Sequence, residues 1–541
     1  MPIAAVIGAI AVLLACWASV AQPARAQAVT VQAASTAGAA APTLVTTSAG
    51  ALEGVATATG AEFRGIPYAA PPTGELRWRP PQPVESWTGT RAADTFPPVC
   101  PQAPPSPSGS SEDCLYLNVT VPAGLADGPL PVIVWFHGGG FEIGEGADYD
   151  PAKLADAGAV VVTVDYRLGL LGFLAHPALA NQPGGANGNY GLMDQQAALR
   201  WVQSEIAAFG GNPGNVAIAG QSAGGLSVLA HLASPTAKGL FHRAVIQSGA
   251  FALVQKSLAD AERDGQASAT ALGCDDQSAE CLRSVPVESL VANQPLSITP
   301  GYVDGTVLRE SVGTAIATGR FNRVPIVNGV NTQEERIFTN LGLSVTKGAT
   351  TVLPGPIDAS NYEATIAANF GVDQKTAARI ASAYPLKKYP SAAQAFSVLN
   401  SDANFSCPAI VLDAAASRYV PTFAYEFNDA AAPERFVPDT LGAPTAATHQ
   451  SELQYLFDLP IAPIPGELSA EQQQLASAMR EAWVQFARTG SPATDAVAWP
   501  EFELRHPRVL SLETPAPEVE PRFAADHHCG LWAGVALFGA R

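Results

Sequence analysis

A serine between two glycines is the first place where this sequence could do chemistry. The motif is Gly220-Gln221-Ser222-Ala223-Gly224, with a strand predicted before it over 216–219 and a helix after it. So tight a turn leaves no room for side chains at the glycines, and it holds the serine exposed at a helix N-terminus. An ordinary glycine-rich turn is the alternative. The strand–turn–helix context favours Ser222 as a nucleophile toward an acyl carbonyl.

A second glycine motif could bind the oxyanion that such an attack creates. The apolar run 131–136 leads through His137 into three consecutive glycines, 138–140. Backbone N–H groups of Gly139, Gly140 and Ala223 could stabilise a tetrahedral intermediate, because bare glycine backbone can approach a ligand closely. A flexible loop is the alternative for these glycines. We expect His137 to be structural rather than catalytic.

The elements that must position these groups alternate between short strands and amphipathic helices. Amphipathic patterns over 191–208 and 470–488 predict helices. Continuous apolar runs predict strands buried on both faces, as in parallel sheets, at 132–135, 160–164, 216–219, 245–247 and 324–327. This alternation predicts an α/β fold with a large, mostly parallel central sheet flanked by helices. Active sites in such sheets lie at the carboxyl ends of the strands.

Several longer motifs together resemble the type-B carboxylesterases, the family of α/β-hydrolases that includes cholinesterases. The matching segments are 63–69, 112–118, 166–169, 209–224 and 241–249. The resemblance spans about residues 50 to 535. It implies an α/β-hydrolase fold, a Ser–Glu–His triad and hydrolysis of carboxylic esters through an acyl-enzyme intermediate.

The resemblance also points to the acid of the triad. Chain order in this fold is nucleophile, acid, histidine, and Glu334 in the segment 329–338 matches the family's glutamate. The chain departs from the family pattern at Gln333 and at Glu335, where aspartate and glycine are usual. Glu335 is the alternative acid, and we expect it to be solvated. Ser248 matches a serine that the family places beside the triad.

The histidines that follow the acid are His449, His506, His527 and His528. His449 lies in a segment, 448–457, that is similar to the family's histidine loop, with Gln450 in place of a glycine. A histidine pair can indicate a metal, but no further ligands stand at suitable spacing. We therefore expect His449 to be the general base, and we expect no metal and no cofactor.

Seven cysteines indicate how the chain is cross-linked and where it works. Cys16 lies in the apolar N-terminal segment. For the other six, many pairings are possible, and the resemblance implies the disulfides Cys100–Cys114, Cys274–Cys281 and Cys407–Cys529. Such bridges require an oxidising compartment. The loop between the first pair has no aromatic residue, whereas cholinesterases carry there a tryptophan that holds the quaternary ammonium. A general carboxylesterase is therefore expected rather than a choline esterase.

The N-terminus reads as a secretory leader. Residues 3–21 are apolar, and Ala24-Arg25-Ala26 fits a cleavage site, so we expect a signal peptide over 1–26. The segment has no Lys or Arg before the apolar run. A membrane anchor and a lipid on Cys16 are the alternatives. Residues 27–43 then form a flexible tether, and 44–541 form the catalytic domain of a secreted or periplasmic protein.

Composition narrows the remaining possibilities. Of 541 residues, 47% are hydrophobic, which suits a large core, and the net charge of −18 argues against a nucleic-acid partner. No stable membrane span is expected in the mature chain, whose partner is a small-molecule ester. A lipase or a specialised esterase for bulky natural-product or xenobiotic esters is the runner-up. A non-catalytic adhesion protein is disfavoured because Ser222, Glu334 and His449 are all present. The oligomeric state stays open.

Overall fold

The computed structural model describes residues 41–104, 109–124, 128–180, 187–294, 301–346, 348–442 and 446–538. The proposed leader therefore lies outside the described residues, as does the tether up to residue 40. Ala41 is buried, and the carbonyl of Thr43 accepts a hydrogen bond from Gly54 N. Among the described residues, folded contacts therefore extend to residue 41, three residues before the expected domain boundary at residue 44.

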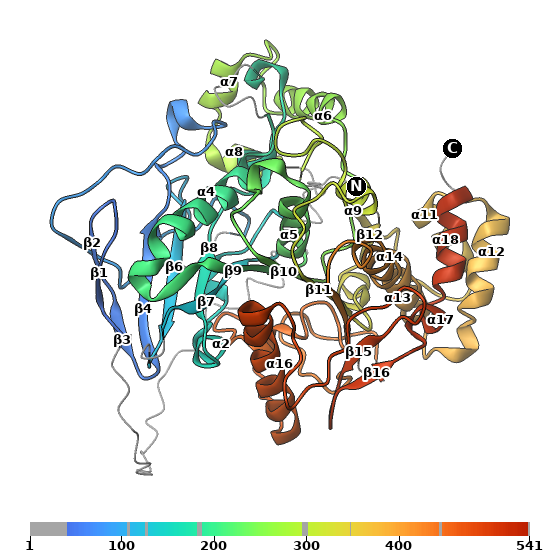
Figure 1. The fold of residues 1–541 in the computed structure, drawn as a ribbon. Coiled ribbons are helices and arrows are strands. Elements are labelled where there is room, and N and C mark those ends of the chain that lie inside the picture. The colour runs from blue at the N-terminus through green and yellow to red at the C-terminus, as the bar shows by residue number, and fades with distance from the viewer. Residues whose placement is uncertain are drawn as a thin grey trace.

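An 11-stranded sheet runs through the molecule, with helices on both faces (Figure 1). Its order is β16-β15-β14-β11-β10-β9-β7-β8-β6-β4-β3. The strands are β3 (Val55–Thr57), β4 (Gly60–Pro67), β6 (Tyr116–Pro122), β7 (Leu130–Phe136), β8 (Val160–Val164), β9 (Gly211–Gln221), β10 (Arg243–Gln247), β11 (Ile326–Asn331), β14 (Thr422–Phe427), β15 (Val509–Leu512) and β16 (Glu518–Glu520). A small sheet of β1 (Leu44–Thr46), β2 (Ala51–Glu53) and β5 (Thr90–Ala92) lies at the N-terminal end, and β12 (Leu343–Thr346) pairs with β13 (Ala349–Val352).

The centre of the large sheet is parallel, and its edges are antiparallel. Strands β8, β7, β9, β10, β11, β14 and β15 run in one direction. Pairings at the edges, from β8 to β6, β4 and β3 and from β15 to β16, are antiparallel. Every apolar run predicted as a strand lies in or overlaps one of β7 to β11, so the expected α/β class with a mostly parallel sheet is confirmed.

The helices complete the layers. They are α2 (Ala152–Asp156), α3 (Gly169–Phe173), α4 (Tyr190–Glu205), α5 (Ala223–Ala233), α6 (Leu258–Ala271), α7 (Ala279–Ser284), α8 (Val287–Ala292), α9 (Val312–Thr318), α10 (Arg336–Asn340), α11 (Tyr362–Phe370), α12 (Gln374–Ala383), α13 (Ala392–Ser401), α14 (Cys407–Ala416), α15 (Leu453–Leu456), α16 (Ala470–Thr489), α17 (Phe523–Asp526) and α18 (Cys529–Phe538). The helices predicted over 191–208 and 470–488 are α4 and α16.

Successive side chains along each strand point to opposite faces of the sheet, so the apolar core has two halves. On β7, Val134 belongs to the apolar cluster that includes α4, α5 and α14, while Trp135 belongs to the cluster that includes α2 and α16. Two further apolar clusters lie outside the sheet, one around α11, α12, α13 and α18 and one around α3, α7 and α8. The sheet is therefore buried on both faces, which explains why its strands read as continuous apolar runs.

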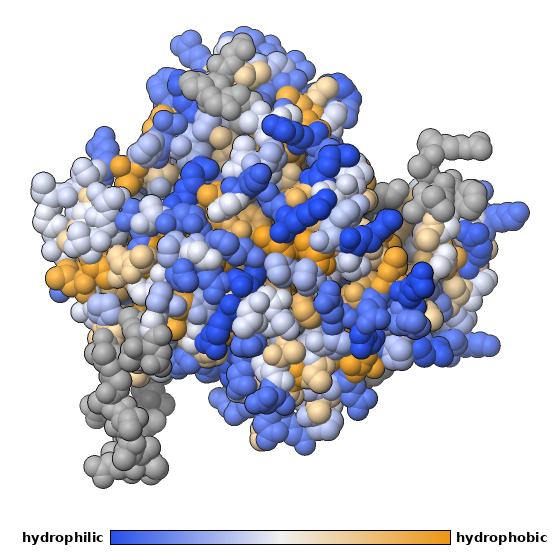
Figure 2. Space-filling view, in the orientation of Figure 1, coloured by the Kyte–Doolittle hydropathy of each residue, from blue (hydrophilic) through white to orange (hydrophobic). Residues whose placement is uncertain are grey.

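Disulfides tie the outer segments to this core. They join Cys100 to Cys114, Cys274 to Cys281, and Cys407 to Cys529, which are the pairs that the family resemblance implied. The last bridge fastens the start of α18 to the start of α14. Among the described residues, no helix is both long and apolar enough to cross a membrane. The outer surface mixes polar and apolar side chains, with apolar ones gathered near the middle of the face in Figure 2.

Candidate active site

Ser222 lies at the turn between β9 and α5, in a backbone conformation that few residues adopt. Its φ is 57° and its ψ is −121°, and its N–H donates to Gln247 O at 2.8 Å, at the end of the neighbouring strand β10. A serine with positive φ is strained. This turn places the Ser222 side chain at the carboxyl edge of the sheet, where it is partly exposed while the adjacent residues are buried.

The glycines on either side of Ser222 are required by space. A Cβ at Gly220 would lie 2.5 Å from the carbonyl carbon of Gly224. A Cβ at Gly224 would lie 1.9 Å from the carbonyl oxygen of Phe136, on β7. Both distances are far below van der Waals contact, so this turn can form only with glycine at both positions.

Glu334 and His449 come together from segments 115 positions apart in the chain. Glu334 follows β11, and His449 precedes α15. His449 Nδ1 lies 2.5 Å from Glu334 Oε2, and both side chains are buried. Since an ionised carboxylate only accepts, the hydrogen of this bond belongs to Nδ1 of the imidazole. The other ring nitrogen, Nε2, then carries the lone pair that can accept a proton.

The second oxygen of Glu334 is held as firmly as the first. Glu334 Oε1 accepts from Ser248 Oγ at 2.6 Å and from Asn331 N at 2.7 Å. Ser248 follows β10 as Ser222 follows β9, and its φ is also positive, at 52°. These contacts fix the carboxylate in one orientation and compensate for its burial. Ser248 thus lies beside the acid, where the resemblance put it.

The segments that carry the acid and the histidine are paired through their backbones. Gln333 N donates to Ala447 O at 2.9 Å, and Asn331 Nδ2 donates to Thr448 O at 2.7 Å. Thr448 immediately precedes the histidine. The position of His449 is therefore set by one main-chain contact and one contact from the Asn331 side chain, as well as by its own ring.

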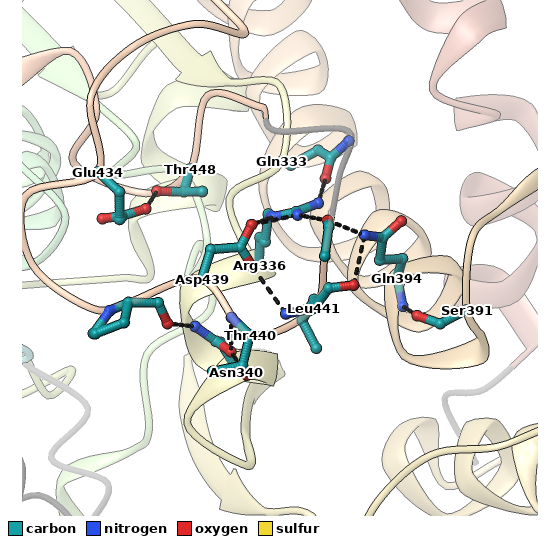
Figure 3. A network of polar contacts seen from close by, with 12 residues as sticks. Gln333, Arg336, Asn340, Ser391, Gln394, Glu434, Asp439, Thr440, Leu441 and Thr448 are labelled. Atoms are coloured by element: carbon teal, nitrogen blue, oxygen red, sulfur yellow. Dashed lines mark hydrogen bonds and ion pairs between the residues drawn. The ribbon is translucent and has the colours of Figure 1, made fainter.

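The buried side chain of Arg336 also connects the acid segment to the histidine segment (Figure 3). Arg336 Nε donates to Asp439 Oδ2 at 3.1 Å, and its Nη2 reaches Gly442 O at 2.5 Å. Gln394 of α13 donates to the same Gly442 oxygen. Because Asp439 and Gly442 lie on the chain between β14 and His449, one guanidinium joins the acid segment, the histidine segment and α13. The Arg336 side chain is only 2% exposed and that of Asp439 is 20% exposed, so the arginine is shielded from solvent and its partner is only partly shielded.

The glycine loop after β7 faces the serine turn. Gly139 and Gly140 have φ values of 100° and 66°, and a Cβ at Gly139 would lie 2.1 Å from Ile143 O. Within the described part of the chain, no protein acceptor bonds to the N–H groups of Gly139, Gly140 and Ala223. Such unpartnered donors can bind an oxyanion.

His137 is buried away from proton transfer. Its Nδ1 donates to Gly138 O at 2.8 Å, and its ring stacks on Tyr166 with centroids 4.4 Å apart. Burial lowers the pKa of His137 to about 4, so the ring is neutral near pH 7. These contacts agree with the expectation that His137 is structural.

The expectation that Glu335 is solvated was wrong. Its side chain is fully buried and accepts from Val345 N, on β12, at 3.0 Å, while its own N–H donates to Ser401 Oγ. The chain folds back onto β12 directly after the acid, which turns position 335 inward. Burial, together with the neighbouring Glu334, raises the pKa of Glu335 well above its ordinary value.

The other histidines have separate roles. His506 is exposed in a turn. His527 Nδ1 lies 2.6 Å from Asp402 Oδ1 and its Nε2 lies 2.9 Å from Glu426 Oε1, so it bridges two buried carboxylates beneath the C-terminal helices. Within the described ranges, no group of three or more His, Cys, Asp or Glu residues could hold a metal ion.

Sequence reasoning missed a second buried glutamate beside the site. Glu452 accepts from Asn331 Nδ2 at 2.6 Å and from Gln247 Nε2 at 3.2 Å. Burial, added to the charge of Glu334, raises the pKa of Glu452 to about 7. No pattern around position 452 distinguishes it from an exposed helix glutamate. Only the meeting of β10, β11 and the histidine segment gives it this surrounding.

Two phenylalanines contact the ring of His449, and a third packs on one of them. The rings of Phe338 and Phe405 lie 5.2 Å and 5.4 Å from the His449 ring, and Phe251 packs on Phe405 at 5.5 Å. Phe405 belongs to a π-helical segment, Asp402–Ser406, between α13 and α14. Such segments are frequent at functional sites. Phe251 and Phe338 are partly exposed, so a bound molecule can touch them.

Known proteins that are similar to this chain are esterases. A family model described as "Carboxylesterase family" matches residues 41–532. The chain is 37% identical over 482 residues to fumonisin B1 esterase of Sphingopyxis macrogoltabida, covering 85% of this chain and 84% of that protein. It is 34% identical over 500 residues to para-nitrobenzyl esterase of Bacillus subtilis (strain 168), covering 87% and 95%. A solved PNB esterase structure superposes with a TM-score of 0.74 at 31% identity, covering 90% of this chain and 99% of that one.

The raised pKa of Glu452 predicts a pH-dependent stability. The folded protein holds the Glu452 proton up to about pH 7, whereas the unfolded chain releases it near the ordinary value of 4.5. The free energy of unfolding that this group contributes therefore falls as pH rises between those values, by on the order of 3 kcal/mol. Glu452→Gln should remove that fall. The free energy of unfolding of the variant, relative to that of the wild type, should therefore be higher at pH 8 than at pH 5.

Urea unfolding at pH 5 and pH 8 measures the difference. The matched control is Glu501→Gln, because Glu501 is exposed and should leave the pH dependence unchanged. If the free energy of unfolding of Glu452→Gln changed between pH 5 and pH 8 by as much as that of the wild type, the raised pKa of Glu452 would be contradicted.

Proposed function

The chain belongs to the carboxylesterase family and hydrolyses carboxylic esters, and we propose that Ser222, Glu334 and His449 carry out this reaction. The observation that carries the proposal is the buried contact of 2.5 Å between His449 Nδ1 and Glu334 Oε2 beside the strained serine turn. It leaves Nε2 as a base at the edge of the sheet where the serine is exposed. The α/β-hydrolase fold is the one that the solved PNB esterase shares.

The proposed reaction has two halves. Ser222 Oγ attacks the ester carbonyl carbon while its proton passes to His449 Nε2, and Glu334 stabilises the imidazolium. N–H groups of Gly139, Gly140 and Ala223 bind the oxyanion. The proton on Nε2 then goes to the leaving alcohol oxygen, which leaves an acyl-serine. A water molecule attacks that acyl group, gives a proton to Nε2, and its oxygen leaves in the carboxylic acid as Ser222 regains its hydrogen.

We propose that the preferred ester carries an apolar group beside the histidine. The rings of Phe251, Phe338 and Phe405 support this, because they offer apolar contact next to His449. The loop between Cys100 and Cys114 has no aromatic residue to hold a quaternary ammonium. A larger, specialised ester is the second candidate, favoured by the relative named fumonisin B1 esterase and by cocaine esterase of Homo sapiens, 33% identical over 479 residues, covering 82% of this chain and 81% of that protein.

We also propose that residues 1–26 are a secretory leader and that the mature enzyme is secreted or periplasmic. The disulfides of the described part support an oxidising compartment. The catalytic domain then starts near residue 44 and reaches the C-terminal helices.

Replacing the nucleophile tests the catalytic proposal. Ser222→Ala should lose at least about 10⁴-fold in ester hydrolysis and should not react with a fluorophosphonate probe, because the probe bonds to an activated serine oxygen. Ser227→Ala is the matched control, since Ser227 lies on the same helix with its Oγ donating to Ala223 O at 3.1 Å. It should keep probe labelling. Full labelling of Ser222→Ala would overturn the proposal, and a wild-type protein that is never labelled would indicate a binding protein.

A panel of p-nitrophenyl esters tests the apolar subsite. Butyrate should exceed acetate in kcat/KM by at least about 30-fold, because each of its two additional methylenes adds about 1–3 kcal/mol of discrimination in an apolar pocket. Phe338→Ala and Phe405→Ala should reduce that ratio. Acetate preferred over butyrate, or a ratio that neither variant changes, would contradict an apolar group beside His449.

A further inference from the structure

The contact at His449 Nε2 in this structure comes from the residue before the serine. Gln221 is fully buried, and its Nε2 lies 3.2 Å from His449 Nε2. Among the hydrogen bonds of the described residues, none joins Ser222 Oγ to the imidazole. The nitrogen that must take the serine proton is therefore held by an amide.

The direction of this bond follows from the other side of the ring. Because Nδ1 donates to Glu334, Nε2 of the neutral imidazole carries a lone pair and can only accept. The Gln221 amide nitrogen then donates to it. The orientation assigned to the amide thus fits a neutral His449.

The amide oxygen of Gln221 has no partner in that orientation. Gln221 Oε1 is buried without a hydrogen bond within the described part of the chain. It faces the glycine loop, since a Cβ built on Gly138 would lie 3.0 Å from it. A buried amide oxygen without a donor costs free energy. Gln221 Oε1 is thus an unpaired hydrogen-bond acceptor close to the imidazole.

Protonation of the imidazole changes the kind of hydrogen-bond partner that Nε2 needs, from a donor to an acceptor. After Ser222 gives up its proton, Nε2 becomes a donor, and an amide N–H facing it would repel it. A half-turn of the Gln221 amide about its Cγ–Cδ bond would bring Oε1 to Nε2–H. No proton enters or leaves the amide in this exchange.

We propose that Gln221 is a positioning residue whose amide serves both protonation states of His449, donating to the neutral ring and accepting from the imidazolium. The inference rests on the proposed triad. Gln221 holds the neutral ring in place until Ser222 takes over at Nε2, and it then helps to stabilise the charged ring without adding a charge.

The absence of charge at position 221 matters because acids surround this histidine. Glu334 faces Nδ1 from the end of β11, and Glu452 interacts with His449 from the start of α15. Tyr425 of β14 lies in the field of both glutamates, and His137, before the glycine loop, is neutral near pH 7. A carboxylate at position 221 would be a further negative charge beside one imidazole.

Gln221→Glu tests the inference through the pH dependence of fluorophosphonate labelling. A carboxylate cannot donate to neutral Nε2, but it strongly favours the imidazolium. The acid limb of the labelling rate should therefore move to higher pH by about one unit or more, while the alkaline plateau stays within about tenfold of wild type. Gln221→Met has similar size and no hydrogen-bonding amide. It should lower the plateau about tenfold, as expected for a lost hydrogen bond, and it should lack the shift of about one unit.

The matched control is Gln277→Glu, because Gln277 also contacts a histidine, with Oε1 2.9 Å from His176 Nε2, between α6 and α7. It should leave the profile unchanged. An acid limb that does not move in Gln221→Glu, or a wild-type plateau in Gln221→Met, overturns the inference. Failure of the proposed function has a different result, in which the wild type is unlabelled or Ser222→Ala is labelled.

Discussion

The buried hydrogen bond between Glu334 and His449 is the constraint on which the rest of the site depends. A carboxylate and an imidazole removed from water are stable only when each is fully bonded. The structure meets that requirement with Ser248 and the backbone N–H of Asn331 on the acid. On the histidine segment, the Gln333 main chain and the Asn331 side chain donate to the backbone before His449. The end of β10 and the Arg336 network support the same geometry, since Ser248 holds the acid and Arg336 joins the segments that carry the acid and the histidine.

The sheet explains why so distant residues meet. Ser222, Ser248 and Glu334 follow the neighbouring parallel strands β9, β10 and β11, so their side chains emerge at one edge. This part of the architecture could be predicted, because buried parallel strands read as apolar runs and the glycine turns admit no other residue. His449 could be found only through the family resemblance, as its loop has no periodic pattern.

Other features depend on tertiary surroundings that no local pattern encodes. Glu335 is buried because the chain returns onto β12, and Glu452 because three segments converge on it. Gln221 contacts the histidine from a position that the serine motif leaves unspecified. Arg336 lies in a short helix like many surface arginines, and its burial follows from the path of the chain between β14 and the histidine. In each case a polar residue type suggested exposure, and specific hydrogen bonds made burial possible.

A comparison of two adjacent glutamates tests the role of the Glu334–His449 contact most directly. Glu334→Gln and Glu335→Gln are equally conservative changes at neighbouring buried positions, but only Glu334 touches the imidazole. We expect Glu334→Gln to lower the rate of fluorophosphonate labelling by about 10⁴-fold, because the residue that orients a catalytic histidine becomes an amide. Glu335→Gln should keep a rate within about tenfold of wild type. The opposite ranking, with Glu335→Gln as the inactive variant, would contradict that role of the Glu334–His449 contact.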